Sequence, residues 1–158
     1  RWHSFPTRRS SDLLFTQLMT HYRDKRIMVL ASGFSQNIAN YMNETFNLYG
    51  FRATANSHLE FLRGTNEEDI LLIIISNSGD TQRLVELAEI AQKHQMALIA
   101  FVGDKKSKVG DLATLTISTN TYSPKILQSF TPNFFFGTVL NQFELLLNGA
   151  LKNLYEAP

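Results

Sequence analysis

The apolar run from Ile70 to Ile75 constrains the fold of this chain more than any other stretch of its sequence. A strand with one face in water alternates apolar and polar residues, whereas this run is apolar on both faces, which is typical of a central strand in a parallel sheet. Parallel neighbours must be joined by long crossover connections, which are usually helices. The run therefore predicts an α/β fold, and it is far too short to cross a bilayer.

The rest of the chain alternates between strand-like and helix-like segments. Strands are expected at 26–32, 51–56, 69–76, 97–103 and 114–119, longer helices at 14–22, 33–50, 81–94 and 133–155, and short helical turns at 58–64 and 104–113. This alternation predicts a three-layer, doubly wound α/β sandwich with a five-stranded parallel sheet and right-handed crossovers. In such sheets, ligands bind beyond the carboxyl ends of the strands.

Composition narrows the class of protein. The chain has 158 residues, the size of one domain, and its net charge of +1 gives no electrostatic case for binding nucleic acid or an anionic membrane. It has no cysteine, and its four histidines lack metal-ligand spacing. No secretory signal is evident. We therefore expect a cytoplasmic protein with no metal and no cofactor.

Residues 1–13 are unlike the remainder of the chain, because they lack apolar periodicity and carry three arginines against Asp12. One interpretation is a disordered basic leader or linker. Another is favoured by residues 3–13, HSFPTRRSSDL, which resemble one translated frame of a common sequencing-library adapter. We expect residues 1–13 to be an extraneous or disordered leader, the domain to span 14–158, and the start of the gene to be missing.

The turn SNSGDT at 76–81 follows the apolar run and crowds hydroxyl groups around one glycine. Gly79 permits a tight turn. Ser76, Ser78 and Thr81 can donate hydroxyl protons, and Asn77 can donate from its amide. The helix expected to start here adds backbone N–H groups and the positive end of its dipole. This pattern predicts a phosphate site; the alternative is a plain helix cap and turn.

A second turn of this kind follows the first strand. The sequence ASGFS places Gly33 at a strand-to-helix junction and Ser35 at the start of the helix. Helix capping is again an alternative, and neither the dinucleotide pattern GxGxxG nor the nucleotide pattern GxxxxGK[ST] is present. Two such turns on neighbouring strands predict one anion pocket, which neither turn would establish alone.

The two turns, in this order, resemble those of the sugar isomerase (SIS) domain family of phosphosugar-binding proteins. ASGFS fits the family's G-x-G-x-S except at Ala31, and SNSGDT fills every defined position of [ST]-x-S-G-x-T. The likeness in spacing and in the strand–helix pattern extends over 14–158. The resemblance implies a ligand-binding set for the sugar phosphate: Gly33, Ser35, Ser76, Asn77, Ser78, Gly79 and Thr81.

Within the family, the chain most resembles the effector domains of RpiR/MurR-type bacterial transcription regulators. In those proteins an SIS domain follows an N-terminal helix-turn-helix domain, senses a phosphosugar and helps the protein to dimerise. The resemblance therefore implies a phosphosugar-sensing effector domain in a homodimer. It also implies contact with DNA only through a helix-turn-helix domain that is missing from this chain.

An isomerase would need a general base close to its substrate. The loop at 120–133, where family isomerases carry such groups, has no Glu, Asp or His. His58 is the best remaining candidate, although it is equally typical of an exposed loop. We therefore assign no catalytic residue and favour a sensor. A sugar-phosphate aldose–ketose isomerase that uses His58 or a partner-chain residue is the alternative, and an amino-sugar etherase or a structural dimer module is a third class.

The last expected helix carries a wide apolar stripe. Its members are Phe136, Leu140, Phe143, Leu147, Ala150 and Leu154. A stripe wider than one core face needs predicts a second buried surface, such as a homodimer contact. A fully packed core helix is the alternative.

Overall fold

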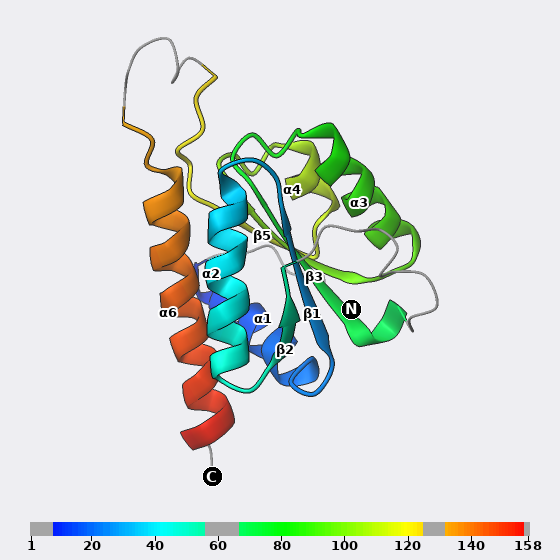
Figure 1. Ribbon diagram of the computed structural model, residues 1–158, viewed down its shortest axis with the longest axis vertical. Coiled ribbons are helices and arrows are strands. Elements are labelled where there is room, and N and C mark those ends of the chain that lie inside the picture. Colours follow the sequence, from blue (N-terminus) through cyan, green and yellow to red (C-terminus); the bar gives the residue numbers. More distant parts are fainter. Residues whose placement is uncertain (1–7, 56–66, 125–131, 157–158) are drawn as a thin grey trace.

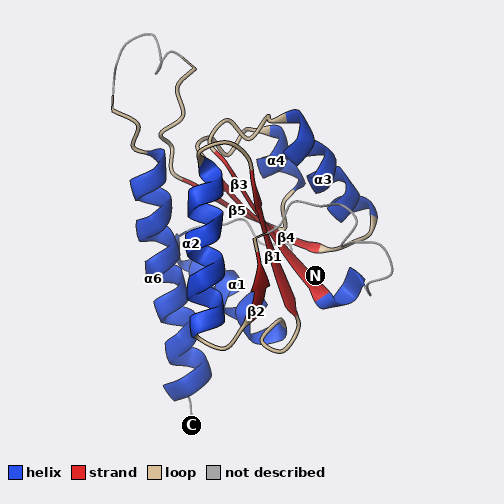
Figure 2. Cartoon of the chain, viewed as in Figure 1, coloured by secondary structure: helices blue, strands red, loops and turns tan. Residues whose placement is uncertain are grey.

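A computed structural model describes residues 8–55, 67–124 and 132–156. It contains one five-stranded sheet in the order β2-β1-β3-β4-β5, and every strand pair is parallel. Helices cover both faces of the sheet (Figures 1 and 2). The predicted α/β sandwich with a five-stranded parallel sheet is confirmed. The elements are α1 Arg8–His21, β1 Arg26–Ala31, α2 Ser35–Leu48, β2 Arg52–Thr54, η2 Glu67–Asp69, β3 Ile70–Ser76, α3 Gln82–Lys93, β4 Ala97–Val102, α4 Lys108–Leu112, β5 Leu115–Ser118 and α6 Phe135–Glu156.

The apolar run forms β3, the middle strand of the sheet. Its residues pair with β1 on one side, from Arg26↔Ile70 to Ala31↔Ile75, and with β4 on the other. Every residue of β3 is buried. Alternate side chains point to opposite faces of a strand, so β3 contributes to both cores and needs apolar residues throughout.

Two separate cores result from this alternation. Ile73 and its neighbours on one face of the sheet pack with α1, α2 and α6. Ile74 and its neighbours on the other face pack with α3 and α4. Figure 1 shows the same three layers, with the sheet between the two groups of helices. None of the helices in the described ranges has the length and apolar character needed to cross a membrane.

Helix α1 begins at Arg8 rather than at Leu14, where the sequence pattern placed its start. Its buried anchors are Phe15, Leu18 and Met19, which pack in the same core as α6. Residues 8–13 lack apolar spacing, but they contain neither proline nor glycine, so the helix extends backward from its anchored part. Residues 8–13 are thus helical; the foreign origin of residues 1–13 stays a prediction.

Helix α6 uses its wide stripe mainly for packing inside this domain. Phe143, Leu147 and Ala150 are buried, while Leu140 and Leu154 are half-buried against the same core. The stripe is therefore largely a core face, as the alternative interpretation held. The exposed apolar side chain of α6 is instead Leu145, which is 67% exposed.

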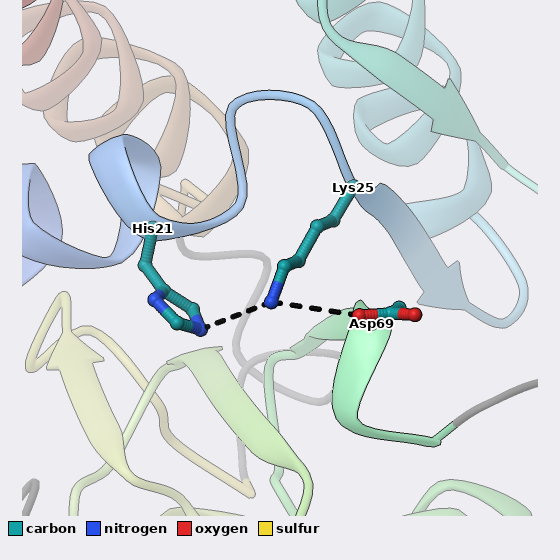
Figure 3. A network of polar contacts seen from close by, with 3 residues as sticks. All are labelled: His21, Lys25 and Asp69. Carbon is teal, nitrogen blue, oxygen red and sulfur yellow. Dashed lines mark hydrogen bonds and ion pairs between the residues drawn. The ribbon is translucent and has the colours of Figure 1, made fainter.

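The amino ends of β1 and β3 are joined by a small polar network (Figure 3). Lys25 Nζ lies 3.5 Å from Asp69 Oδ1 and 3.4 Å from His21 Nε2. The side chains of Lys25 and Asp69 are partly exposed, so this pair adds little to stability. The network lies at the edge of the sheet opposite the carboxyl ends of the strands, which leaves that other edge for a ligand.

Candidate functional site

A cavity of about 340 Å³ lies at the carboxyl ends of β1 and β3. The helix that follows β1, α2, packs on one face of the sheet, whereas the helix that follows β3, α3, packs on the other. Such a change of direction in the strand order is where open α/β sheets bind ligands. The cavity is lined by Ser32, Phe34, Ser35, Ile75, Ser76, Asn77, Ser78, Thr81, Tyr122, Ser123, Pro124, Asn133 and Phe136.

The structure brings together the five polar residues predicted from the two turns. Their side chains come from the ends of β1 and β3 and the starts of α2 and α3, and all five line the cavity: Ser35, Ser76, Asn77, Ser78 and Thr81. Gly33 and Gly79 are not lining residues. They have φ values of +60° and +68°, which is the left-handed conformation that each turn requires and that glycine adopts without strain.

Backbone hydrogen bonds to its own serines shape the turn after β3. Ser76 is 4% exposed, and its Oγ accepts the N–H of Gly79 at 3.0 Å. The Oγ of Ser78 accepts the N–H of Asp80 at 3.2 Å. A hydroxyl that accepts through its oxygen can still donate its proton. These serines can therefore hold the turn and donate to an anion in the cavity at the same time.

The start of α4 supports the same turn from behind. The N–H of Val109 donates to the carbonyl oxygen of Gly79 at 2.9 Å, and the N–H of Lys108 donates to Asp80 Oδ1 at 3.0 Å. Ser107 caps α4 by accepting the N–H of Gly110 at 3.2 Å, and its side chain lies against Gly79. The turn is thus held in one shape before any ligand arrives, which reduces the entropy lost on binding.

The two helices that begin at the cavity are not capped by the side chains of their N-cap residues. Thr81 is the N-cap residue of α3, in an extended conformation, and its side chain makes no capping bond. Phe34, the N-cap residue of α2, has no side-chain acceptor. The capping interpretation is therefore wrong for Thr81, whose hydroxyl lines the cavity instead. Helix starts of this kind favour a negatively charged ligand.

Gly103 joins three of the loops that surround the cavity. Its N–H donates to the carbonyl oxygen of Asn77 at 2.9 Å, and its own carbonyl oxygen accepts the N–H groups of Thr121 and Tyr122 at 3.1 and 3.2 Å. Asn77 Oδ1 is buried without a hydrogen-bond partner in the described part of the chain, and it lies close to Gly103. The close approach of these loops positions both Asn77 and Tyr122 at the cavity.

Several lining residues were missed by the sequence analysis. Ser32 and Phe34 stand inside the ASGFS turn, so the motif marked their place without marking their role. Tyr122, Ser123 and Pro124 belong to the loop after β5, and Asn133 and Phe136 belong to the start of α6. Only the length of that loop, which is unusual for a plain connection, could have suggested that it lines a site.

The lining residues in the described ranges are all uncharged. His58 lies outside the described residues. Glu144 is exposed on α6 and does not line the cavity; it accepts a hydrogen bond from the hydroxyl of Tyr41. This hydrogen bond is the main reason that the pKa of Tyr41 is raised above its usual value. The cavity can therefore offer hydroxyl, amide and backbone dipoles to an anion, together with apolar contacts from its aromatic side chains.

Comparison with known proteins supports this description. The model of the SIS domain family matches residues 22–142. No curated protein sequence matches the chain significantly.

Solved structures share the fold at low sequence identity. NanR of Vibrio vulnificus, complexed with ManNAc-6P, is 19% identical with a TM-score of 0.77, and the match covers 94% of this chain and 56% of that chain. The protein c3406 of E. coli CFT073, in complex with arabinose 5-phosphate, is 19% identical with a TM-score of 0.74, covering 94% and 81%. The sugar isomerase domain of an RpiR transcription factor from Sphaerobacter thermophilus is 18% identical with a TM-score of 0.70, covering 95% and 86%.

Proposed function

The chain belongs to the SIS domain family, and from this premise we propose that it is the phosphosugar-sensing effector and dimerisation domain of a cytoplasmic, RpiR-type transcriptional regulator. The ligand of this domain is a phosphorylated sugar. The regulator reaches DNA through a separate helix-turn-helix domain, which this sequence does not contain.

The observation that carries the proposal is the group of hydroxyl donors around the cavity. Ser76 and Ser78 are fixed by accepting backbone N–H groups, and Thr81 is not used as a cap. The dipoles of two helix starts add to these donors. A phosphate ester offers several acceptor oxygens, so it can satisfy such a ring of neutral donors. Among the solved structures of the same fold, two are complexes with ManNAc-6P and with arabinose 5-phosphate.

The chemistry of the lining favours a sensor over an isomerase. Moving a proton between two sugar carbons needs a general base within hydrogen-bond reach of the substrate. Asp, Glu, His and Lys are all absent from the lining residues in the described ranges. Incubating the chain with a sugar phosphate that binds, and following the sugar by NMR, tests this part of the proposal. Conversion of the aldose to the ketose would support the isomerase instead.

Replacing Thr81 with valine tests the phosphate site. Valine keeps the shape and the extended backbone preference of threonine but removes the hydroxyl, which makes no capping bond. We expect the affinity for the sugar phosphate that binds wild type best to fall about tenfold or more, while the melting temperature of the free protein stays nearly unchanged. Thermal shift and calorimetry with hexose, pentose and amino-sugar phosphates measure both quantities.

Thr20→Val is the matched control for this experiment. It removes a similar hydroxyl, which donates to the carbonyl oxygen of Thr16 at 2.9 Å on α1, away from the cavity. Its affinity should equal that of wild type. The proposal fails if no phosphosugar shifts the melting temperature of the folded protein, or if both variants bind as wild type does.

The homodimer has a candidate surface on the outer sides of α2 and α6. Leu48 and Leu145 are 79% and 67% exposed, and Tyr41 lies on the same pair of helices. We expect a dimer by light scattering, and Leu145→Glu should convert it to a monomer because a carboxylate would be buried in the contact. Gln92→Glu adds the same charge on α3, on the other side of the sheet, and should remain dimeric. A wild-type chain that is monomeric at all concentrations would contradict this part of the proposal.

A further inference from the structure

We propose that the cavity selects sugar phosphates with an uncharged, apolar substituent, such as an N-acetyl group, and rejects those with a free amine. This inference rests on the proposed function and deepens it. It assigns the choice between ligands to an aromatic wall, which consists of Phe34, Tyr122 and Phe136. All three residues line the same cavity as the hydroxyl donors.

Phe34 is the first observation that supports this inference. Its side chain is 81% exposed, although it stands between Gly33 and Ser35 at the mouth of the cavity. An apolar ring of this size in water is stabilised when a ligand covers it. Because the ring lines the cavity beside the hydroxyl donors, the ligand that occupies the cavity is the group placed to cover it.

Phe136 supplies a fixed apolar surface from a different element. It is half-buried on α6, packs against the main core, and its ring lies 5.8 Å from the ring of Phe135 in an edge-to-face arrangement. The start of α6 is itself held by Asn133, whose Oδ1 accepts the N–H of Phe135 at 3.0 Å. Phe136 is therefore preorganised and loses little freedom when a ligand binds.

The two chemistries of the cavity divide the ligand between them. The hydroxyl donors come from the turns at the ends of β1 and β3, so the phosphate lies there. The aromatic wall comes from the start of α2, the loop after β5 and the start of α6. The sugar and its substituents therefore face aromatic rings rather than further charged or hydroxyl groups. Rings of this kind pack well on C–H faces and on a methyl group.

The missing counter-charge decides against a free amine. An ammonium group that enters the cavity loses part of its hydration, and this cost is recovered only beside a carboxylate. Neither Asp nor Glu is among the lining residues in the described ranges. Acetylation removes the charge and adds a methyl group that the aromatic wall can contact. The expected order of affinity is N-acetylated sugar first, unsubstituted sugar second and free amine last.

Calorimetry on the 158-residue chain tests this order with N-acetylglucosamine 6-phosphate, glucose 6-phosphate and glucosamine 6-phosphate. We expect the acetylated sugar to bind at least about tenfold more tightly than the free amine. Equal or tighter binding of glucosamine 6-phosphate would overturn the inference and leave the proposed function in place. Failure of all three, and of the pentose phosphates, would remove the proposed function and the inference together.

Phe34→Ala tests the role of the aromatic wall. Because Phe34 is so exposed, this variant should fold as wild type does. Affinity for N-acetylglucosamine 6-phosphate should fall about five- to tenfold, and affinity for glucosamine 6-phosphate should change less than about twofold. Leu13→Ala, which truncates a side chain that is 60% exposed on α1, is the control and should change neither affinity. An unchanged preference in Phe34→Ala would overturn the assignment of selectivity to this wall.

Discussion

Replacing Gly79 with alanine is expected to lower the free energy of unfolding by about 2 to 5 kcal/mol and to abolish sugar phosphate binding. Two effects add. Alanine is strained at the φ of +68° found here. Its Cβ would also stand 2.1 Å from the Oγ and 2.2 Å from the Cβ of Ser107. Since that serine caps α4, the turn and α4 would have to separate. Urea unfolding and calorimetry measure the two losses.

Gly33→Ala is the matched control. Gly33 has nearly the same φ, +60°, in the corresponding turn after β1, but an added Cβ would meet nothing within 4 Å. Only the backbone strain remains, which costs about 1 to 2 kcal/mol. The difference between the two variants therefore measures the contact with Ser107. If Gly79→Ala were no less stable than Gly33→Ala, α4 would not be supporting the turn as the structure indicates.

Gly103→Ala should have the second largest effect, with a loss of about 3 kcal/mol in the free energy of unfolding. An added Cβ would lie 2.2 Å from Asn77 Oδ1, 2.5 Å from the carbonyl oxygen of Asn77 and 2.7 Å from the Cβ of Tyr122. Two of these atoms cannot move without the backbone or the whole side chain. Because Asn77 and Tyr122 both line the cavity, affinity for sugar phosphates should fall with stability.

Gly149→Ala provides the contrast for this measurement. Gly149 lies inside α6, where an added Cβ would meet nothing within 4 Å. Alanine favours the helix over glycine, so this variant should gain about 0.5 to 1 kcal/mol. A Gly103→Ala protein with the stability and affinity of wild type would show that the three loops do not meet closely at Gly103.

The sheet was predictable because each strand carries its own physical signature. The run from Ile70 to Ile75 excludes a strand with one wet face, and the helical spacing of Leu84, Leu87 and Ala88 predicts the crossover helix that follows it. Both patterns reflect burial, which the fold must satisfy locally. The start of α1 was predicted less well, because its first residues are held by continuity with the buried part of the helix rather than by contacts of their own.

The candidate site divides in the same way. The turns at 31–35 and 76–81 were recognisable because a strand, a glycine and several hydroxyls stand together in the sequence. Tyr122, Asn133 and Phe136 were not, since they reach the cavity through tertiary packing. No local pattern shows that Gly103 would bring Tyr122 beside Asn77. The phosphate end of the site was therefore visible in the sequence, and the end proposed to hold the sugar was not.

The uncharged lining of the cavity has a further consequence. Dissolved ions screen interactions between exposed charges over distances of about 10 Å at moderate ionic strength. In the described ranges the cavity wall presents no ammonium or guanidinium group for such ions to screen. Capture of an anion by dipoles alone should therefore vary little as the salt content of the surroundings rises and falls. A domain built in this way would respond to the abundance of its ligand and not to osmotic conditions.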